Sequence, residues 1–503
     1  GDRGRRIVKY MAGGVFVPIK ESEVEPESGK DLLTTLDVNI QDITETALHR
    51  MMVDNQCEYG TCIVMEVNTG KIKAIANLGR RTEGTYFEDL NYAIRTSEPG
   101  STFKLATLLA LLDDHKVNLN SRVNLEGGKW NINGRTVYDS EPHGLREVTV
   151  KQAFEHSSNV GMAKMTMAAY AKNPNQYLRH LQQLYFHQPS GIGLAGEGNP
   201  VVKNTQSSTW SATTLPWMSF GYEVQISPIQ TLMLYNAVAN GGKLFKPYLV
   251  NAVLQNGLEI KSFQPQVLNP RVSQPETIRQ LQECLEGVCQ EEGGTAYKVF
   301  KNSPYRVAGK TGTALMANGN RGYADHIYQS SFAGYFPADQ PMYSCIVVIR
   351  NKPAAAKFYG ATVAAPVFKE IADKLYVGPN RASLPGTWLA QQTVSPGNSY
   401  SYLGFAKDLR TIFRSLQWNY RDSAGQQPWG KAMVSTDNTI LKNIAVVSNR
   451  MPDVRGMGLR DALYVLESCQ VKVSAVGRGK VKQQSLAPGS PLRPDQQVWV
   501  MLN

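Results

Sequence analysis

The sequence has few of the residues and patterns that define several common classes of protein. Its 503 residues include 6 cysteines and 7 histidines, too few for a disulfide-rich scaffold. No apolar run approaches the roughly 18 residues that a membrane-spanning helix needs, and the opening stretch GDRGRRIVKY lacks the apolar segment of a signal peptide. We therefore expect either a cytoplasmic protein or the soluble part of a longer one.

The cysteines do not indicate disulfides or a metal site. Cys284 and Cys289 lie on a predicted helix, where Cα atoms five positions apart are more than about 7 Å from each other, too far for an unstrained disulfide. Cys57 and Cys62 have the same spacing. This spacing is uncommon among zinc ligands and no histidine is near either pair. We predict buried free thiols, no metal and no cofactor.

Positive charge is in excess but is not concentrated. Lysine and arginine number 53 against 42 acidic residues, for a net charge of +11. The basic residues are scattered, and no helix-turn-helix, zinc-finger or RNA-binding aromatic pattern accompanies them. We expect no nucleic-acid partner, because a solvated basic surface suits anionic lipid or cell-wall polymer equally well.

The order of predicted elements indicates a mixed α/β fold of the α+β class. DVNIQDITETALHRMM has the spacing of an amphipathic helix, and TCIVMEVNTGKIKAIANL reads as a hairpin that turns at residues 68–70. Three further strand-like runs lie at 305–315 and 330–351. Two early strands, three late strands and helices between them predict a five-stranded antiparallel sheet that is flanked by helices.

A serine and a lysine stand three residues apart in EPGSTFKLATLLALLDD, residues 98–114. Ser101 and Lys104 would share one face at the start of a helix that is apolar nearly all round and therefore buried. The free N–H groups of a helix start can hold an oxyanion, and a desolvated lysine can act as a base. The structural alternative is that Ser101 caps the helix and Lys104 extends to solvent.

A second group is EHSSNVGMAKM at 155–165. Ser157 and Asn159 would sit in a short turn between helices and present both side chains to one side. The hydroxyl could pass a proton between the lysine and a leaving amine, and the amide could hold a substrate carbonyl. Serine and asparagine are also ordinary turn and cap residues, so this group means little alone.

A third group is AGKTGTAL, which contains Lys310, Thr311, Gly312 and Thr313 in a predicted strand. Glycine inside a strand marks a close approach by another backbone or a ligand. A lysine and a hydroxyl beside it would form an anchor for a carboxylate. The structural alternative is an edge strand with solvated lysine and threonine.

The three groups occur in the order found in penicillin-binding proteins and serine β-lactamases. The sequence resembles the class B penicillin-binding proteins, which are monofunctional cell-wall transpeptidases, over residues 31–375. PGSTFK, SSNVGM, the run FGYEVQISPIQTLMLYNAVANGG and EEGGTAYKV carry this resemblance. It implies the fold of a penicillin-binding, β-lactamase-like transpeptidase domain.

The resemblance implies a role for each residue of the first two groups. Ser101 would be the acylated nucleophile and Lys104 its general base. Ser157 would relay the proton, and Asn159 would position Lys104 and the substrate. Attack on a D-Ala-D-Ala bond would release D-alanine, an amine of a neighbouring stem peptide would complete the cross-link, and β-lactams would stop at the acyl stage.

The third group would then bind the substrate. Lys310 would supply positive charge, and Thr313 would supply a hydroxyl for the terminal carboxylate, on the strand that also carries Thr311 and Gly312. The backbone N–H groups of Ser101 and Thr313 would form the oxyanion hole.

The C-terminal part resembles a PASTA module, because MPDVRGMGLRDAL matches the start of that family. We expect a pedestal remnant at 1–30, the transpeptidase domain at 31–375, a linker at 376–448 and the PASTA domain at 449–503. This architecture implies a septal, extracytoplasmic domain that a missing N-terminal helix anchors in the membrane. The implied partners are stem peptides, the lipid-linked precursor, a membrane glycosyltransferase and other division proteins.

Three other functions stay open from the sequence. A β-lactamase or a D,D-carboxypeptidase would share the fold. The nearest match to the Glu-x-x-x-Asn deacylation site of class A lactamases is Glu197-Gly198-Asn199, whose spacing is wrong. A non-catalytic sensor of β-lactams or cell wall would also acylate Ser101.

Residues 399–448 form a possible second PASTA-like unit. Its predicted helix repeats the stripe of the PASTA helix at a distance of 50 residues, and a strand-like run follows each helix: LQWNY in one case and VKVSAV in the other. The alternative is an amphipathic linker helix. The matched positions are Leu409, Ile412, Phe413 and Leu416 with Leu459, Ala462, Leu463 and Leu466.

Overall fold

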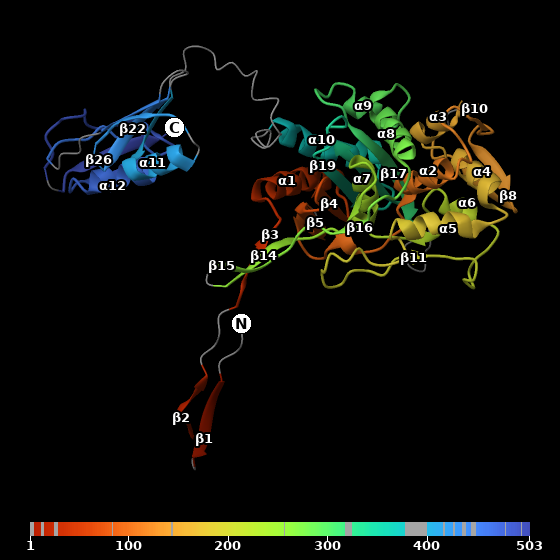
Figure 1. The fold of residues 1–503 in the computed structure, drawn as a ribbon, viewed down its shortest axis with the longest axis horizontal. Coiled ribbons are helices and arrows are strands. Elements are labelled where there is room, and N and C mark those ends of the chain that lie inside the picture. The colour runs from red at the N-terminus through yellow and green to blue at the C-terminus, as the bar shows by residue number, and fades with distance from the viewer. Residues whose placement is uncertain are drawn as a thin grey trace. The chain divides into compact units, whose positions relative to one another are not determined.

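A computed structural model of the protein divides the chain into two compact units, Gly1–Arg381 and Ala382–Asn503, and each is described here by itself (Figure 1). Within the described residues, no helix combines the length and the apolar character that crossing a membrane requires. The described residues are 5–11, 15–24, 29–82, 84–141, 144–255, 257–316, 324–377, 400–415, 418–425, 428–434, 439–443, 449–477, 479–493 and 495–502.

A six-stranded antiparallel sheet forms the centre of the first unit. The five predicted strands are present, and the sixth, β6, is a short addition that the sequence analysis missed. Its Tyr86 is buried and donates to the carbonyls of Met52 and Cys57, which holds the strand at the edge of the sheet. In their order across the sheet, the strands are β17 (Ala308–Met316), β18 (Ile327–Phe336), β19 (Tyr343–Arg350), β4 (Tyr59–Glu66), β5 (Ile72–Thr82) and β6 (Thr85–Phe87).

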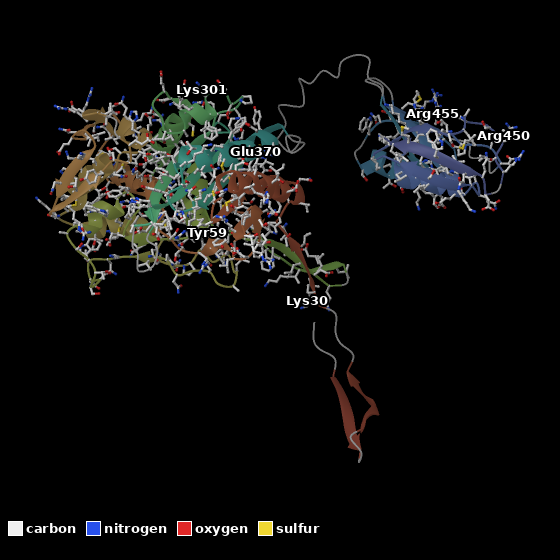
Figure 2. All side chains as sticks on the ribbon, turned by 180° about the vertical axis from the view of Figure 1, so that it is seen from behind. Lys30, Tyr59, Lys301, Glu370, Arg450 and Arg455 are labelled. Carbon is white, nitrogen blue, oxygen red and sulfur yellow. The ribbon has the colours of Figure 1, made fainter. Side chains whose placement is uncertain are left out.

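Helices cover the sheet on both faces, so its central strands are buried apolar runs rather than alternating ones. Helix α1 (Val38–Asn55) packs on β4 and β5, and α10 (Gly360–Val377) packs on β17, β18 and β19. Arg50 of α1 forms an ion pair with Glu370 of α10; Figure 2 labels Glu370. Helix α7 (Pro228–Ala239) contacts β18, β19 and β4.

The chain between β6 and β17 contains the predicted helices and also the short strands β7 to β16, which the sequence analysis did not predict. At its centre lies α2 (Lys104–Asp113), whose residues from Lys104 to Leu112 are all buried. The first unit also contains α3 (Val150–Glu155), α4 (Asn159–Tyr170), α5 (Pro174–Gln183), α6 (Thr214–Met218), α8 (Pro275–Gln290), α9 (Tyr297–Phe300) and the 3-10 helices η1 (Tyr92–Ile94) and η2 (Gly100–Phe103). All six cysteines of the protein are buried and free, which confirms the prediction made from their spacing.

Short strands complete the first unit. Two of them, β1 and β2, pair in antiparallel fashion within the segment 1–30 that is expected to be a pedestal remnant. The pairs are β1 (Arg5–Met11) with β2 (Val15–Val24), β7 (Arg122–Asn124) with β10 (Glu147–Thr149), β8 (Lys129–Ile132) with β9 (Arg135–Tyr138), β11 (Val201–Val202) with β12 (Val224–Gln225) and β13 (Leu244–Phe245) with β16 (Val267–Asn269). A further sheet contains β3 (Asp31–Thr34), β14 (Val250–Gln255) and β15 (Leu258–Ser262).

The second unit contains two modules that share one helix-and-three-strand arrangement, and the first module has one further strand, β20, paired with β22. In each, a helix is followed by a strand that pairs in parallel with the module's last strand, and the middle strand pairs antiparallel with that same last strand. This arrangement is what the hypothesis of a second PASTA-like unit requires. The modules are β20 (Tyr400–Phe405), α11 (Ala406–Ser415), β21 (Arg421–Ser423), β22 (Trp429–Val434) and β23 (Thr439–Asn443), and then α12 (Leu459–Glu467), β24 (Lys472–Val476), β25 (Val481–Gln484) and β26 (Gln497–Leu502).

Two details of the proposed repeat were wrong. Ile412 is 49% exposed, whereas the matching Ala462 is buried, so the two stripes agree at fewer positions than predicted. The run LQWNY is not a strand where it is described. Instead, Trp418 and Tyr420 pack on Phe413 of α11, and the strand begins at Arg421. Leu416 lies outside the described residues.

Candidate active site

Ser101 lies in η2, which packs against the edge strand β17. Its side chain lines a cavity, and its hydroxyl makes no hydrogen bond with the residues that the structure describes. Gly312 permits this packing, because a Cβ there would collide with Ser331 and press on Thr102. The predicted close approach at this glycine is confirmed.

Lys104, the first residue of α2, is completely buried. The alternative in which it extends to solvent is therefore wrong. Its Nζ donates to the carbonyl oxygen of Ser157 at 2.6 Å and to the Ser157 Oγ at 3.1 Å. Burial lowers the pKa of Lys104 to about 7, and the Asp139 carboxylate opposes this shift. A lysine with such a pKa is partly neutral at pH 7 and can accept a proton.

The turn between α3 and α4 brings Ser157 to this amine. Ser157 has a left-handed backbone, with φ of 58°. The next residue, Ser158, caps α4 by accepting from the Gly161 N–H, and it donates to Asp139 at 2.8 Å. The two serines of the turn therefore have different contacts: Ser157 bonds to Lys104, and Ser158 caps the start of α4.

Asn159 begins α4 and lies beside the turn rather than on the lysine. Its amide donates to the Tyr138 carbonyl at 2.7 Å, and it lines a second cavity of about 450 Å³ that shares Asp139, Thr313 and other residues with the first. Both hydrogen bonds of the Lys104 amine run to Ser157, so among the described residues Asn159 does not bond to the lysine.

Lys310 is a second buried amine in the site. The structural alternative was an edge strand with a solvated lysine. Strand β17 does lie at the edge of the sheet, but Lys310 is completely buried, so the solvated lysine is wrong. Burial lowers its pKa well below the usual value, and the charge of Lys104 adds to this effect. Its Nζ donates to the Thr311 carbonyl at 3.2 Å, and Lys310 is not among the residues that line the cavity.

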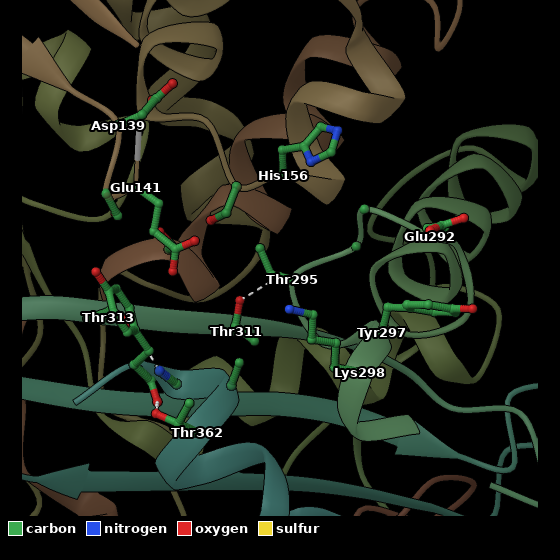
Figure 3. Close-up of a pocket in the computed structure, with 18 of the residues that line it drawn as sticks. Asp139, Glu141, His156, Glu292, Thr295, Tyr297, Lys298, Thr311, Thr313 and Thr362 are labelled. Atoms are coloured by element: carbon green, nitrogen blue, oxygen red, sulfur yellow. Dashed lines mark hydrogen bonds between the residues drawn. The ribbon is translucent and has the colours of Figure 1, made fainter. Parts of the chain in front are cut away.

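The hydroxyls of the third group open to the cavity. Thr311 Oγ1 and Thr295 Oγ1 are hydrogen bonded at 2.8 Å, and Thr313 Oγ1 accepts from the Gly360 N–H at 3.1 Å. The cavity measures about 680 Å³, and Figure 3 shows both threonines on the strand that forms its floor. Its lining also includes Ser101, Ser157, Asp139, Glu141, His156, Glu292, Thr295, Tyr297, Lys298 and Tyr359.

Several residues of this lining were missed by the sequence analysis. Asp139, Glu141 and Tyr359 come from segments without a recognisable motif, and only the chain fold brings them to Ser101. Thr295 lies in the stretch EEGGTAYKV, which had been noted for resemblance but given no role. No sequence motif identifies Asp139, Glu141 or Tyr359 as residues of the site.

The sequence matches the family described as penicillin binding protein transpeptidase domain over residues 60–373. The chain belongs to this family. The PASTA domain family matches residues 449–503, which is the second module of the C-terminal unit.

Individual relatives agree with this assignment. The chain is 30% identical to the peptidoglycan D,D-transpeptidase FtsI of Escherichia coli K12, over 74% of this chain and 60% of that protein. It is 27% identical to the stage V sporulation protein D of Bacillus subtilis, over 100% of this chain and 70% of that protein. The chain therefore spans about three fifths of the length of the first relative.

A solved structure shows a similar fold. Penicillin-binding protein 3 of Mycobacterium tuberculosis, in complex with aztreonam, aligns with a TM-score of 0.62 and 25% identity over 72% of this chain and 82% of that chain.

Proposed function

We propose that this chain acts as a peptidoglycan D,D-transpeptidase that cross-links stem peptides through an acyl-enzyme on Ser101. One observation carries the proposal: the completely buried amine of Lys104, with its pKa lowered to about 7, is held by Ser157 beside a cavity that Ser101 lines. The names of the relatives in this family support the same chemistry.

The first half of the reaction transfers an acyl group to the serine. Ser101 Oγ attacks the carbonyl of the D-Ala-D-Ala bond, and its proton passes to the neutral Lys104 amine. The proton then travels through the Ser157 hydroxyl to the leaving nitrogen, and D-alanine departs. Backbone N–H groups of Ser101 and Thr313 hold the negative charge that develops on the carbonyl oxygen.

The two threonines and Lys310 bind the substrate's terminal carboxylate. Thr311 and Thr313 offer hydroxyls at the cavity floor. Lys310 is the residue before Thr311 on the same strand, and burial lowers the pKa of its amine. An incoming carboxylate would raise that pKa and favour the charged amine, so binding and ionisation reinforce each other.

The second half of the reaction is aminolysis of the ester. An amine of a neighbouring stem peptide attacks the acyl carbonyl, its proton passes to Lys104, and Ser101 leaves as a hydroxyl. β-Lactams acylate Ser101 and stop at that stage. The nitrogen released when the ring opens stays attached to the acyl group, so it does not leave the site and the acceptor amine cannot enter. Aztreonam in the related structure is a ligand of this class.

Transfer is preferred here over the hydrolysis that a β-lactamase or carboxypeptidase performs. Glu197, the nearest candidate for a water-activating acid, accepts from the Ser190 N–H at 2.6 Å. It is not among the residues that line the cavity of Ser101. We expect the penicilloyl ester to persist for minutes to hours.

The setting of the enzyme is proposed from its relatives. The septal role, the extracytoplasmic location, an N-terminal membrane anchor and the partners, a membrane glycosyltransferase among them, follow the family resemblance. The assignments of 1–30 to a pedestal remnant, 31–375 to the catalytic domain and 376–448 to a linker with a degenerate repeat are proposals of the same kind.

Labelled penicillin tests the proposal directly. We expect one label per chain on the tryptic peptide that contains Ser101, and none on the Ser101→Ala variant, whose folding should be preserved because the Ser101 hydroxyl makes no hydrogen bond with the described residues. Label on the Ser101→Ala variant would contradict the mechanism. A wild-type ester with rapid turnover would indicate a β-lactamase, and a stable ester on a protein that does not process stem peptides would indicate a sensor.

A further inference from the structure

The segment after β9 sends two carboxylates to the cavity, and they differ in their bonding. Asp139 accepts from the Ser158 hydroxyl at 2.8 Å and from the Val160 N–H at 2.9 Å, so its carboxylate is hydrogen bonded to the start of α4. Glu141 is exposed and makes no hydrogen bond or ion pair with the described residues. Its carboxylate points into the cavity toward the strand that carries Thr311 and Thr313 (Figure 3).

The charge of Glu141 acts on the wall of the cavity. Tyr359 lines both cavities of the site, and its phenol pKa is raised first by burial and then by the Glu141 carboxylate. The carboxylate is therefore close to the space that a peptide on Ser101 would border. Lys298 and Lys301 also line this cavity, but neither forms an ion pair with Glu141, so its carboxylate can still attract a cation that enters the space.

Resting on the function proposed above, we propose that Glu141 binds the amine of the acceptor peptide and selects acceptors that are cationic in solution. The donor peptide ends in a carboxylate and the acceptor brings an amine, so the two substrates need opposite charges around the same serine. Lys310 is the cation for the first, and Glu141 is the anion for the second.

The step is balanced without another reactant. The ammonium group binds the Glu141 carboxylate and releases one proton to solvent. The neutral nitrogen attacks the ester carbonyl, which forms the N–C bond, and its second proton passes to the Lys104 amine. The C–O bond to Ser101 breaks, and Lys104 returns the proton to the serine oxygen.

The partition of the acyl-enzyme between amine and water tests this assignment. An acyl-D-alanyl thioester serves as donor, glycinamide as the cationic acceptor, and hydroxylamine as a nucleophile that is neutral at pH 7. In Glu141→Gln, we expect the ratio of aminolysis to hydrolysis with glycinamide to fall about tenfold, which corresponds to 1.4 kcal/mol. With hydroxylamine the ratio should stay at the wild-type value. The ratio is measured within one sample, so a change in acylation rate does not affect it.

Glu292→Gln is the matched control. Glu292 also lines the cavity, but its carboxylate points away from the centre in Figure 3. We expect this variant to keep the wild-type ratio for both nucleophiles. Added salt should lower the glycinamide ratio of the wild type and leave that of Glu141→Gln nearly constant.

Three outcomes would overturn the inference: an unchanged glycinamide ratio in Glu141→Gln, an equal fall for both nucleophiles, or a loss of hydrolysis alone, which would make Glu141 an activator of water. Failure of the proposed function looks different. In that case the wild type would neither consume the thioester nor take the penicillin label.

Discussion

At the scale of single residues, the site depends on two lysines that are kept out of water. Both Lys104 and Lys310 are completely buried, and burial lowers the pKa of each. They also act on one another, because the charge of Lys104 lowers the pKa of Lys310 further. A buried amine is therefore available as a base near neutral pH, which an exposed lysine with a pKa near 10.4 is not.

The rate of acylation by penicillin should rise with pH through about 7 and then level off. Only neutral Lys104 can take the proton of Ser101, and a pKa of about 7 places the transition there. The measurement is the second-order rate of acylation with a fluorescent penicillin between pH 5.5 and 9. A rate that falls over this range would rule out Lys104 as the base.

Lys104→Met should lose acylation by about a thousandfold, within the range that general bases contribute. The free energy of unfolding should not decrease, because the variant no longer buries an amine. The pKa of Lys104 is lower in the folded protein than in the unfolded chain, so the free energy of unfolding of the wild type decreases as pH falls from about 10.5 to 7. The variant should lack this pH-dependent decrease. Urea denaturation at pH 7 and 9 measures both points. Wild-type acylation by the variant would contradict the assigned role.

At the scale of elements, α3 and α8 are tied together beside the site by a charge network. Lys151 of α3 forms ion pairs with Glu155 and with Glu283 and Glu291 from α8 and its end. Glu155 is buried, and its Oε1 has no hydrogen-bond partner among the described residues. Burial, followed by the charge of Glu291, raises the pKa of Glu155 to about 7. The network positions the turn that carries Ser157, since α3 leads directly into it.

Glu155→Gln should change the pH dependence of stability. Between about pH 4.5 and 7 the folded protein holds a proton on Glu155 that the unfolded chain has released. The contribution of Glu155 to the free energy of unfolding therefore decreases as pH rises, and it is lost above about pH 7. We expect the variant to gain about 1–3 kcal/mol relative to the wild type between pH 5 and 8. Urea denaturation at the two pH values tests this. A constant difference between the proteins would mean that Glu155 does not titrate in that window.

At the scale of the whole molecule, the two units have separate hydrophobic cores. The sheet and helices of the first unit share one large core. The second unit contains a core around α12 that includes Leu403 and Trp429 of the neighbouring module, and a smaller core beneath α11. The described residues that line the cavity of Ser101 all belong to the first unit.

Thermal unfolding should therefore show two transitions, of which only one responds to a β-lactam. Covalent acylation at Ser101 stabilises the folded first unit, so its midpoint should rise by several degrees while the other transition stays within about 1 °C. Calorimetry with and without penicillin measures this. A protein shortened to residues 1–381 should keep the responsive transition. A single transition that shifts as a whole would show that the units unfold together.

Local patterns in the sequence determined much of this protein. The five strands, the buried helix after Ser101 and the free cysteines follow from periodicity and spacing, and the three motifs are contiguous in the chain. The exposure of Ile412 was misjudged, because a four-residue stripe does not show which neighbours a helix meets.

Only the tertiary structure decided the partners of the motif residues. It placed the Lys104 amine on Ser157, buried the Lys310 amine against the Thr311 carbonyl, and brought Asp139, Glu141 and Thr295 to one cavity. These residues are far apart in sequence, and the contacts between them depend on how helices pack against an edge strand. The pKa of a buried amine follows from that packing, since desolvation is a property of the surroundings and not of the residue.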